Sequence, residues 1–166
     1  MTDANQLIRQ LRLEPLPIEG GYFRQTWSSG DLVSIPGYES PRPAGTAIYY
    51  LLTSGPDSFS AMHRLATGEM YHFYLGDPVE MLLLAEDGPG RRIILGSDIL
   101  GGQHVQYIVP RSVWQGSRLL PGGSFALLGT TMAPGFAARD FTLGRRQELL
   151  RQYPDHATLI RALTRG

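Results

Sequence analysis

The sequence contains no cysteine and no lysine, and each absence removes a class of chemistry. All 15 of its basic residues are arginine. Without cysteine the chain can form no disulfide, no zinc–thiolate site and no thiolate nucleophile, and without lysine it can form no lysine Schiff base. Any metal would have to be held by histidine, carboxylate and amide oxygen.

Net charge and long apolar runs are lacking as well. The formal net charge is zero at pH 7, so the chain offers no general electrostatic attraction to phosphate backbones or anionic lipid. The longest apolar stretch, residues 79–85, contains Glu80 and is too short to cross a bilayer, and the N-terminus has no signal-peptide pattern. We therefore expect a soluble, cytoplasmic protein that binds neither nucleic acid nor membrane.

What the sequence has in abundance is short strand-like segments. A chain of 166 residues that is 42% hydrophobic can bury one core, so we expect a single domain over residues 1–166. Its 20 glycines and 12 prolines are scattered between the apolar runs, as in many-stranded β-proteins with tight turns. This spacing favours a sandwich or barrel over parallel βαβ units. The expected strands are residues 19–27, 46–52, 58–64, 69–75, 79–84, 91–95, 104–109, 113–117 and 125–132.

Helical periodicity is confined to the two ends of the chain. Apolar residues recur at helical spacing over residues 3–13, and Asp3 is a plausible N-cap. After Thr142 the pattern predicts two short helices divided by Pro154. Residues 28–45 contain three prolines and show no periodicity, so we expect a lid or an interface loop there.

The stretch from Ser58 to Gly76 carries most of the candidate chemistry. His63, Glu69 and His72 fall within ten residues of one another among aromatic side chains. Histidine and carboxylate on short strands are the materials of metal sites and of acid–base sites. The three side chains are therefore candidates for either kind of site.

The spacing of this stretch resembles the first motif of the cupin superfamily. That motif reads His-x-His, three or four residues, Glu, six residues and Gly. Here His63-x-Leu65 is followed by three residues, Glu69, six residues and Gly76. Leucine therefore stands where the second histidine of the motif is expected.

A second motif strengthens the resemblance. About forty residues after Glu69, residues 110–115 resemble the superfamily pattern Pro-x-Gly-x-x-His, with Ser112 for the glycine and Gln115 for the histidine. Further segments over nearly the whole chain resemble the branch called cupin-5: residues 17–26, 63–64, 71–74, 109–110, 114–115, 134–136 and 153–157.

The resemblance implies a mainly β fold, the cupin double-stranded β-helix or jelly-roll barrel. A short N-terminal helix and two short C-terminal helices would accompany the barrel. It also implies an RmlC-like small-molecule pocket and a homodimer. It names no ligand, because the cupin-5 branch is largely known as a domain of unknown function.

In a metal-dependent cupin the implied ligands are both histidines and the glutamate of the first motif, with the histidine of the second. Only His63 and Glu69 match, because Leu65 cannot bind a metal and Gln115 offers only a neutral amide oxygen. The reduced set is His63, Glu69 and Gln115, with His72 as a substitute. We expect no cofactor, and a divalent metal is the alternative.

Strand alternation bears on the orientation of His72. If Glu69 faces the barrel interior, alternation sends Tyr71 and Phe73 inward and His72 outward, unless a bulge re-aims it. The same alternation places Arg64 on the face opposite His63.

His63 and Glu69 form an acid–base dyad, because a carboxylate beside an imidazole fixes its tautomer and raises its basicity. Tyr71 is the third catalytic candidate, as the tyrosine that would return a proton. The ligand-binding candidates are an anion-binding arginine, polar orienting groups and aromatic walls: Arg24, Glu19, Gln115, Tyr22, Tyr49, Phe73 and Trp114.

Three functions remain open at this point. The first is a metal-independent isomerase or epimerase acting on a small carboxylated or sugar-like molecule, by analogy with cupin-fold sugar-nucleotide epimerases. The second is a non-catalytic cupin that binds or senses a ligand. The third is a metal-dependent oxygenase or isomerase with the reduced ligand set.

Overall fold

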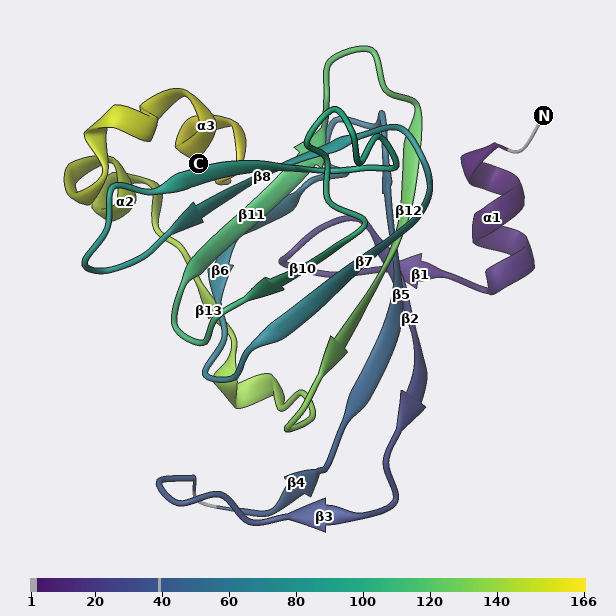
Figure 1. The fold of residues 1–166 in the computed structure, drawn as a ribbon, viewed down its shortest axis with the longest axis vertical. Helices are drawn as coiled ribbons and strands as arrows, with labels where there is room; N and C mark the ends of the chain where they lie inside the picture. Colours follow the sequence, from purple (N-terminus) through teal and green to yellow (C-terminus); the bar gives the residue numbers. More distant parts are fainter. Residues whose placement is uncertain (1–2, 39) are drawn as a thin grey trace.

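Two antiparallel β-sheets lie face to face in the computed structural model, which describes residues 3–38 and 40–166 (Figure 1). The larger sheet has the spatial order β1-β2-β5-β12-β7-β10. These strands span, in that order, Glu14–Pro15, Tyr22–Ser28, Thr46–Thr53, Phe125–Met132, Glu69–Gly76 and Gln106–Val109. The smaller sheet has the order β13-β6-β11-β8-β9. Its strands span Thr142–Leu143, Ser60–Arg64, Trp114–Leu119, Val79–Leu84 and Arg91–Leu95.

The turn-rich excursion contains a short hairpin. Strands β3 (Leu32–Val33) and β4 (Arg42–Pro43) pair with each other and extend beyond the end of the barrel where β5 begins (Figure 1). The segment expected as an irregular loop therefore has some regular structure of its own.

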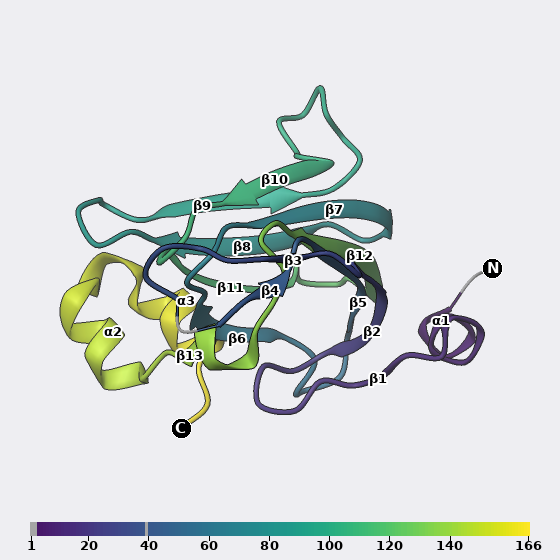
Figure 2. The same cartoon turned by 90° about the horizontal axis from the view of Figure 1, so that it is seen from below.

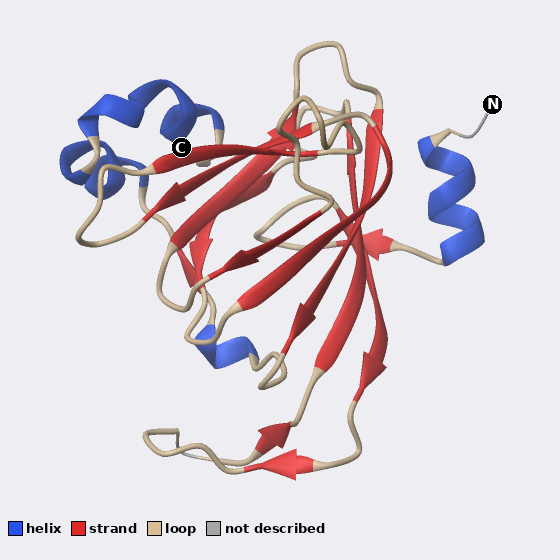
Figure 3. Ribbon diagram, viewed as in Figure 1, coloured by secondary structure: helices blue, strands red, loops and turns tan. Residues whose placement is uncertain are grey.

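Helices lie at the two sides of the barrel and not between its sheets (Figures 2 and 3). Helix α1 (Ala4–Leu11) is on one side, and α2 (Arg146–Gln152) and α3 (Ala157–Ala162) are on the other. Single turns of 3₁₀ helix, η1 (Ala138–Asp140) and η2 (Pro154–His156), complete the elements. None of the helices in the described ranges is long and apolar enough to cross a membrane.

The N-cap expected at Asp3 is confirmed. Its carboxylate accepts a hydrogen bond from the Gln6 backbone N–H at 2.8 Å, and the Gln6 side chain accepts one from the Asp3 N–H at 3.1 Å. This reciprocal pair satisfies two backbone donors that the first turn of a helix leaves free.

The main core lies between the two sheets and follows from strand alternation. Inward-facing residues of both sheets form one buried cluster: Tyr50, Leu52, Tyr71, Phe73, Val79, Met81, Leu83, Ile93, Leu95, Val109, Ala126 and Leu128. The outer face of the smaller sheet buries Met62, Leu82 and Leu84 against α2 and α3. The outer face of the larger sheet packs Leu51 and Leu127 against α1.

The mainly β architecture with one N-terminal and two C-terminal helices is confirmed. Strands β8, β9 and β12 have the predicted bounds, and the others differ by a few residues at their ends. The strand expected from residue 104 begins at Gln106, because His104 instead makes an isolated parallel bridge to Leu95.

Candidate functional site

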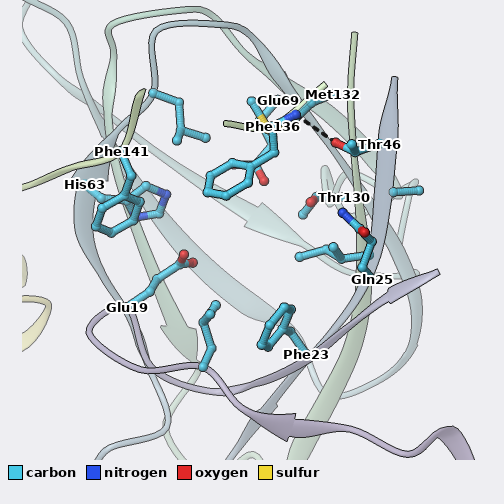
Figure 4. A pocket seen from close by; sticks show the side chains of 14 residues that line it. Glu19, Phe23, Gln25, Thr46, His63, Glu69, Thr130, Met132, Phe136 and Phe141 are labelled. Atoms are coloured by element: carbon cyan, nitrogen blue, oxygen red, sulfur yellow. Dashed lines mark hydrogen bonds between the residues drawn. The ribbon is translucent and has the colours of Figure 1, made fainter. Parts of the chain in front are cut away.

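A cavity of about 110 Å³ lies at the end of the barrel where β6 and β12 end and β5 and β7 begin (Figure 4). Its polar lining comes from Glu19, Gln25, Thr46, His63, Glu69 and Thr130. Its apolar lining comes from Leu16, Phe23, Ala47, Ile48, Leu65, Met132, Phe136 and Phe141. It therefore has the mixed character of a small-ligand site, mostly apolar with a few convergent polar groups.

His63 is fixed in one orientation at the end of β6. Its side chain is 1% exposed, and its Nδ1 lies 2.8 Å from the carbonyl oxygen of Ala61. A carbonyl oxygen can only accept, so Nδ1 carries the proton and Nε2 of the neutral ring keeps a lone pair. The Phe141 ring stacks on the imidazole, with ring centroids 5.0 Å apart (Figure 4).

Glu69 is held by the residue that replaces the histidine of the second motif. Gln115 lies opposite His63 in the pairing of β11 with β6, and its Nε2 donates to Glu69 Oε2 at 2.9 Å. The carbonyl oxygen of the same buried amide has no hydrogen-bond partner among the described residues. Gln115 thus anchors Glu69 and leaves one acceptor beside it unsatisfied.

The environment of Glu69 favours its protonated form. Burial raises the pKa of the Glu69 carboxyl above its ordinary value, and the nearby Glu19 carboxylate raises it further. His63 and hydrogen bonds from Thr130 and Gln115 lower this pKa but do not cancel the effect of burial. The cavity therefore places a carboxyl group of raised proton affinity next to an imidazole.

This pKa shift makes stability depend on pH. The folded state binds the Glu69 proton more tightly than the unfolded state, so stability is greatest below the ordinary carboxyl pKa. It falls as pH rises through the raised folded-state pKa. We expect Glu69→Gln to be more stable than the wild type near neutral pH, with a difference that shrinks in mild acid. Urea unfolding at a series of pH values measures this, with exposed Glu14→Gln as control. A pH-independent difference would contradict it.

A strained turn aims Glu19 into the cavity. Ile18 has φ +71°, a conformation that costs a β-branched residue energy, and Gly20 follows with φ +105°. The Glu19 carbonyl accepts from the Ala61 N–H at 2.8 Å and from the Arg165 guanidinium at 3.2 Å. The carboxylate accepts from the Ser60 hydroxyl at 2.8 Å. Strain held by so many contacts makes this carboxylate a candidate functional group.

The segment between β12 and β13 forms the outer wall of the cavity. It carries Phe136 and Phe141 on either side of η1 (Figure 4). A buried ion pair between Arg42 of β4 and Asp140 of η1 ties this segment to the hairpin. The hairpin segment therefore braces the cavity wall.

Four of the expected ligand-binding residues lie outside the cavity, and their placement is corrected here. Tyr22, Arg24 and Tyr49 are on the outer face of the larger sheet, because alternation in β2 turns Phe23 and Gln25 inward instead. The Arg24 guanidinium lies 5.5 Å from the centre of the Tyr49 ring. The fourth, Trp114, packs on the outer face of the smaller sheet near α2 and α3, with the Arg64 guanidinium 4.6 Å above its ring.

Two further candidates are buried in the core. Tyr71 and Phe73 face inward, as alternation predicted, but neither lines the cavity, so their expected contact with a ligand is also corrected. Burial raises the pKa of the Tyr71 hydroxyl well above its ordinary value, and the Glu69 and Glu19 carboxylates add to this. Tyr71 is therefore a poor proton donor compared with Glu69.

His72 points away from the cavity, as predicted. Its Nε2 lies 2.6 Å from the Thr131 hydroxyl, and its Nδ1 lies 3.2 Å from Gln106 Nε2 on β10. Its ring stacks on that of Tyr74 on the outer face. His72 cannot replace a missing ligand in the cavity.

The remaining donors do not fit a tightly held metal. Leu65 lines the cavity where the first motif has a histidine, and Gln115 turns its amide nitrogen toward Glu69. Within residues 3–38 and 40–166, no three His, Asp or Glu side chains come together as a metal site would require. In the reduced ligand set, Gln115 donates to Glu69, and His63 Nδ1 donates to the Ala61 carbonyl.

Sequence reasoning placed Glu19, His63 and Glu69 in the cavity but missed most of its wall. Phe23 and Ile48 could have been found if the inward face of β2 and β5 had been known. Phe136 and Phe141 carry no periodic signal, because they lie on a segment held by long-range contacts.

Comparison with known proteins identifies relatives of this chain. Residues 5–144 match the model of the Cupin_5 family, described as cupin superfamily (DUF985). A solved protein of Shewanella oneidensis is 31% identical, with TM-score 0.88 over 100% of this chain and 99% of that one. A hypothetical protein of Leishmania major is 29% identical, with TM-score 0.89 over 99% and 100% of the two chains. An uncharacterized protein of Saccharomyces cerevisiae is 29% identical over 80% of this chain and 71% of its own length.

A more distant likeness concerns the fold alone. A dTDP sugar isomerase of Desulfovibrio desulfuricans is 16% identical, with TM-score 0.52 over 81% of this chain and 86% of that one. The jelly-roll barrel expected from the two sequence motifs is thus present.

Proposed function

Because the chain belongs to the Cupin_5 family of the cupin superfamily, we propose that it binds a small organic molecule at the barrel end and moves a proton on it without a metal. The observation that carries this proposal is the pairing of His63 with Glu69 in one cavity. The hydrogen bond to Ala61 leaves His63 Nε2 a proton acceptor, and burial raises the proton affinity of Glu69, as a proton donor requires. Acid–base catalysis requires one group that accepts a proton and a neighbouring group that donates one.

The chemistry that this pair supports is proton removal next to a carbonyl group and its return, as in an isomerase or epimerase. His63 would take the proton, and the Glu69 carboxylic acid would donate one to the developing oxyanion or carbon. Gln115 holds the Glu69 carboxylate in place, and Phe141 keeps the imidazole ring flat against the wall. The distant likeness to a dTDP sugar isomerase agrees with this assignment at the level of fold alone.

Hydrogen–deuterium exchange tests the proposal without knowledge of the product. Small ketones, aldoses and amino ketones would be incubated with the protein in D2O, and deuterium on carbon measured by mass spectrometry. We expect catalysed wash-in for at least one compound that also raises the melting temperature, and we expect it to persist after EDTA treatment.

The outcomes separate the alternative functions. Compounds that stabilise the protein and are recovered without deuterium would replace this proposal with a non-catalytic binding or sensing role. Exchange that stops with EDTA and returns with a divalent cation would instead favour the metal-dependent oxygenase or isomerase. Homodimer formation and a cytoplasmic location stay predictions.

A further inference from the structure

Two polar groups of the cavity, on His63 and Glu19, have an acceptor that the described residues leave free. His63 Nε2 is an acceptor because Nδ1 donates to Ala61. The Glu19 carboxylate has one oxygen bonded to Ser60, and the structure gives the other no hydrogen bond among the described residues. Beside Glu69, the buried carbonyl oxygen of Gln115 also lacks a donor. A ligand that satisfied these groups would have to bring N–H or O–H donors.

The cavity wall supplies no cation to receive an anionic ligand. None of its 14 lining residues is arginine. The arginines nearby are engaged elsewhere: Arg24 over Tyr49, Arg64 over Trp114, Arg42 with Asp140, and Arg165 on the backbone carbonyls of residues 18 and 19. An entering carboxylate would meet the Glu19 carboxylate, with no arginine in the wall to offset the repulsion. This weakens the expectation of a carboxylated ligand.

The apolar wall suits a cation that has an aromatic or aliphatic body. Phe23, Phe136 and Phe141 line the cavity together with Glu19 and Glu69 (Figure 4). Phenyl faces attract ammonium groups, and more strongly where water is excluded. The volume of about 110 Å³ is somewhat below that of an apolar cavity of about 150 Å³ known to hold benzene. The cavity is open at one end, so its size suits a single six-membered ring that carries a short polar substituent.

We infer that the cavity selects a small organic ammonium, such as an aminomethyl group on a six-membered ring, and rejects carboxylates. The ammonium would donate to the Glu19 carboxylate, and the ring would lie against Phe136 and Phe141. This inference rests on the proposed function only because both concern the same cavity. What it adds is the chemical class of the ligand that the cavity binds.

The test is calorimetric titration with three compounds of one shape: benzylamine, benzyl alcohol and benzoate. For the wild type we expect benzylamine to bind most tightly and benzoate to show no binding. Glu19→Gln should weaken benzylamine by about 10- to 100-fold, the value of a charge-assisted hydrogen bond, and change benzyl alcohol little. Glu148→Gln, on the exposed surface of α2, removes the same charge and should leave all three affinities unchanged.

If benzoate bound the wild-type protein as tightly as benzylamine does, the inference would be overturned. This comparison needs no variant, so it does not depend on whether Glu19→Gln folds. Failure of benzylamine to bind at millimolar concentration would also overturn it. An equal loss for benzylamine and benzyl alcohol in Glu19→Gln would show that Glu19 shapes the cavity without reading charge. Selective amine binding without any deuterium exchange would leave the ligand class standing and remove only the proton-transfer proposal.

Discussion

Replacing His63 by glutamine is expected to slow deuterium exchange into a bound ligand by about 100- to 10,000-fold, the usual contribution of one general base. Glutamine keeps an amide donor that can reach the Ala61 carbonyl but has no nitrogen lone pair to accept a proton. Ligand affinity should change little, because Glu19 and the phenylalanines make most contacts. Exchange rates by mass spectrometry and dissociation constants by calorimetry measure the two effects separately.

His72→Gln is the matched control for this variant. This variant replaces His72, which lies in the same motif as His63. The His72 ring lies on the outer face, bonded to Thr131 and Gln106. Its exchange rate should equal that of the wild type. Equal losses in both variants would mean that the histidines act through the barrel's stability, and an unchanged rate in His63→Gln would remove His63 from the mechanism.

Gly76→Ala is expected to destabilise the fold by about 2–6 kcal/mol, from backbone strain and overpacking together. Gly76 closes β7 with φ +105°, which favours glycine. An added Cβ would overlap the carbonyl oxygen of Phe125 and come within 3.0 Å of the Ala126 Cα, both backbone atoms of the neighbouring strand. Since typical domains are stable by only about 5–15 kcal/mol, this is a large fraction of the total.

Gly102→Ala separates the two causes. Gly102 also has a positive φ, +86°, but a Cβ there would meet no atom within 4 Å. Gly102→Ala should therefore lower the free energy of unfolding only by the backbone strain, about 1–3 kcal/mol. Urea denaturation of both variants gives the difference directly. Similar losses at the two positions would show that the backbone of β12 shifts to admit the methyl group.

The sequence predicted the barrel well because each strand carries its own evidence. Strands β8, β9 and β12 consist largely of aliphatic or β-branched residues and lie close to turn-forming glycine, proline or aspartate, so their ends could be placed without tertiary information. The orientation of His72 could also be predicted, because Glu69 fixed the phase of alternation along β7.

The walls of the cavity were less predictable, for two physical reasons. In β2 both faces carry aromatic or long side chains, so Tyr22 and Arg24 could not be assigned to a face until the pairing with β5 was known. Phe136 and Phe141 sit on an irregular segment whose position depends on the contact between Arg42 and Asp140, 98 residues apart. No local pattern encodes such a contact.

The contact between Arg165 and the Glu19 carbonyl joins residues 146 positions apart in the chain. Closing so long a loop is entropically costly and is favourable only once the intervening strands are already paired. We expect this contact, and with it the final anchoring of the Glu19 turn, to form late in folding, after the barrel. A partly folded chain would have strands but no binding site, so ligand binding reports the completed fold.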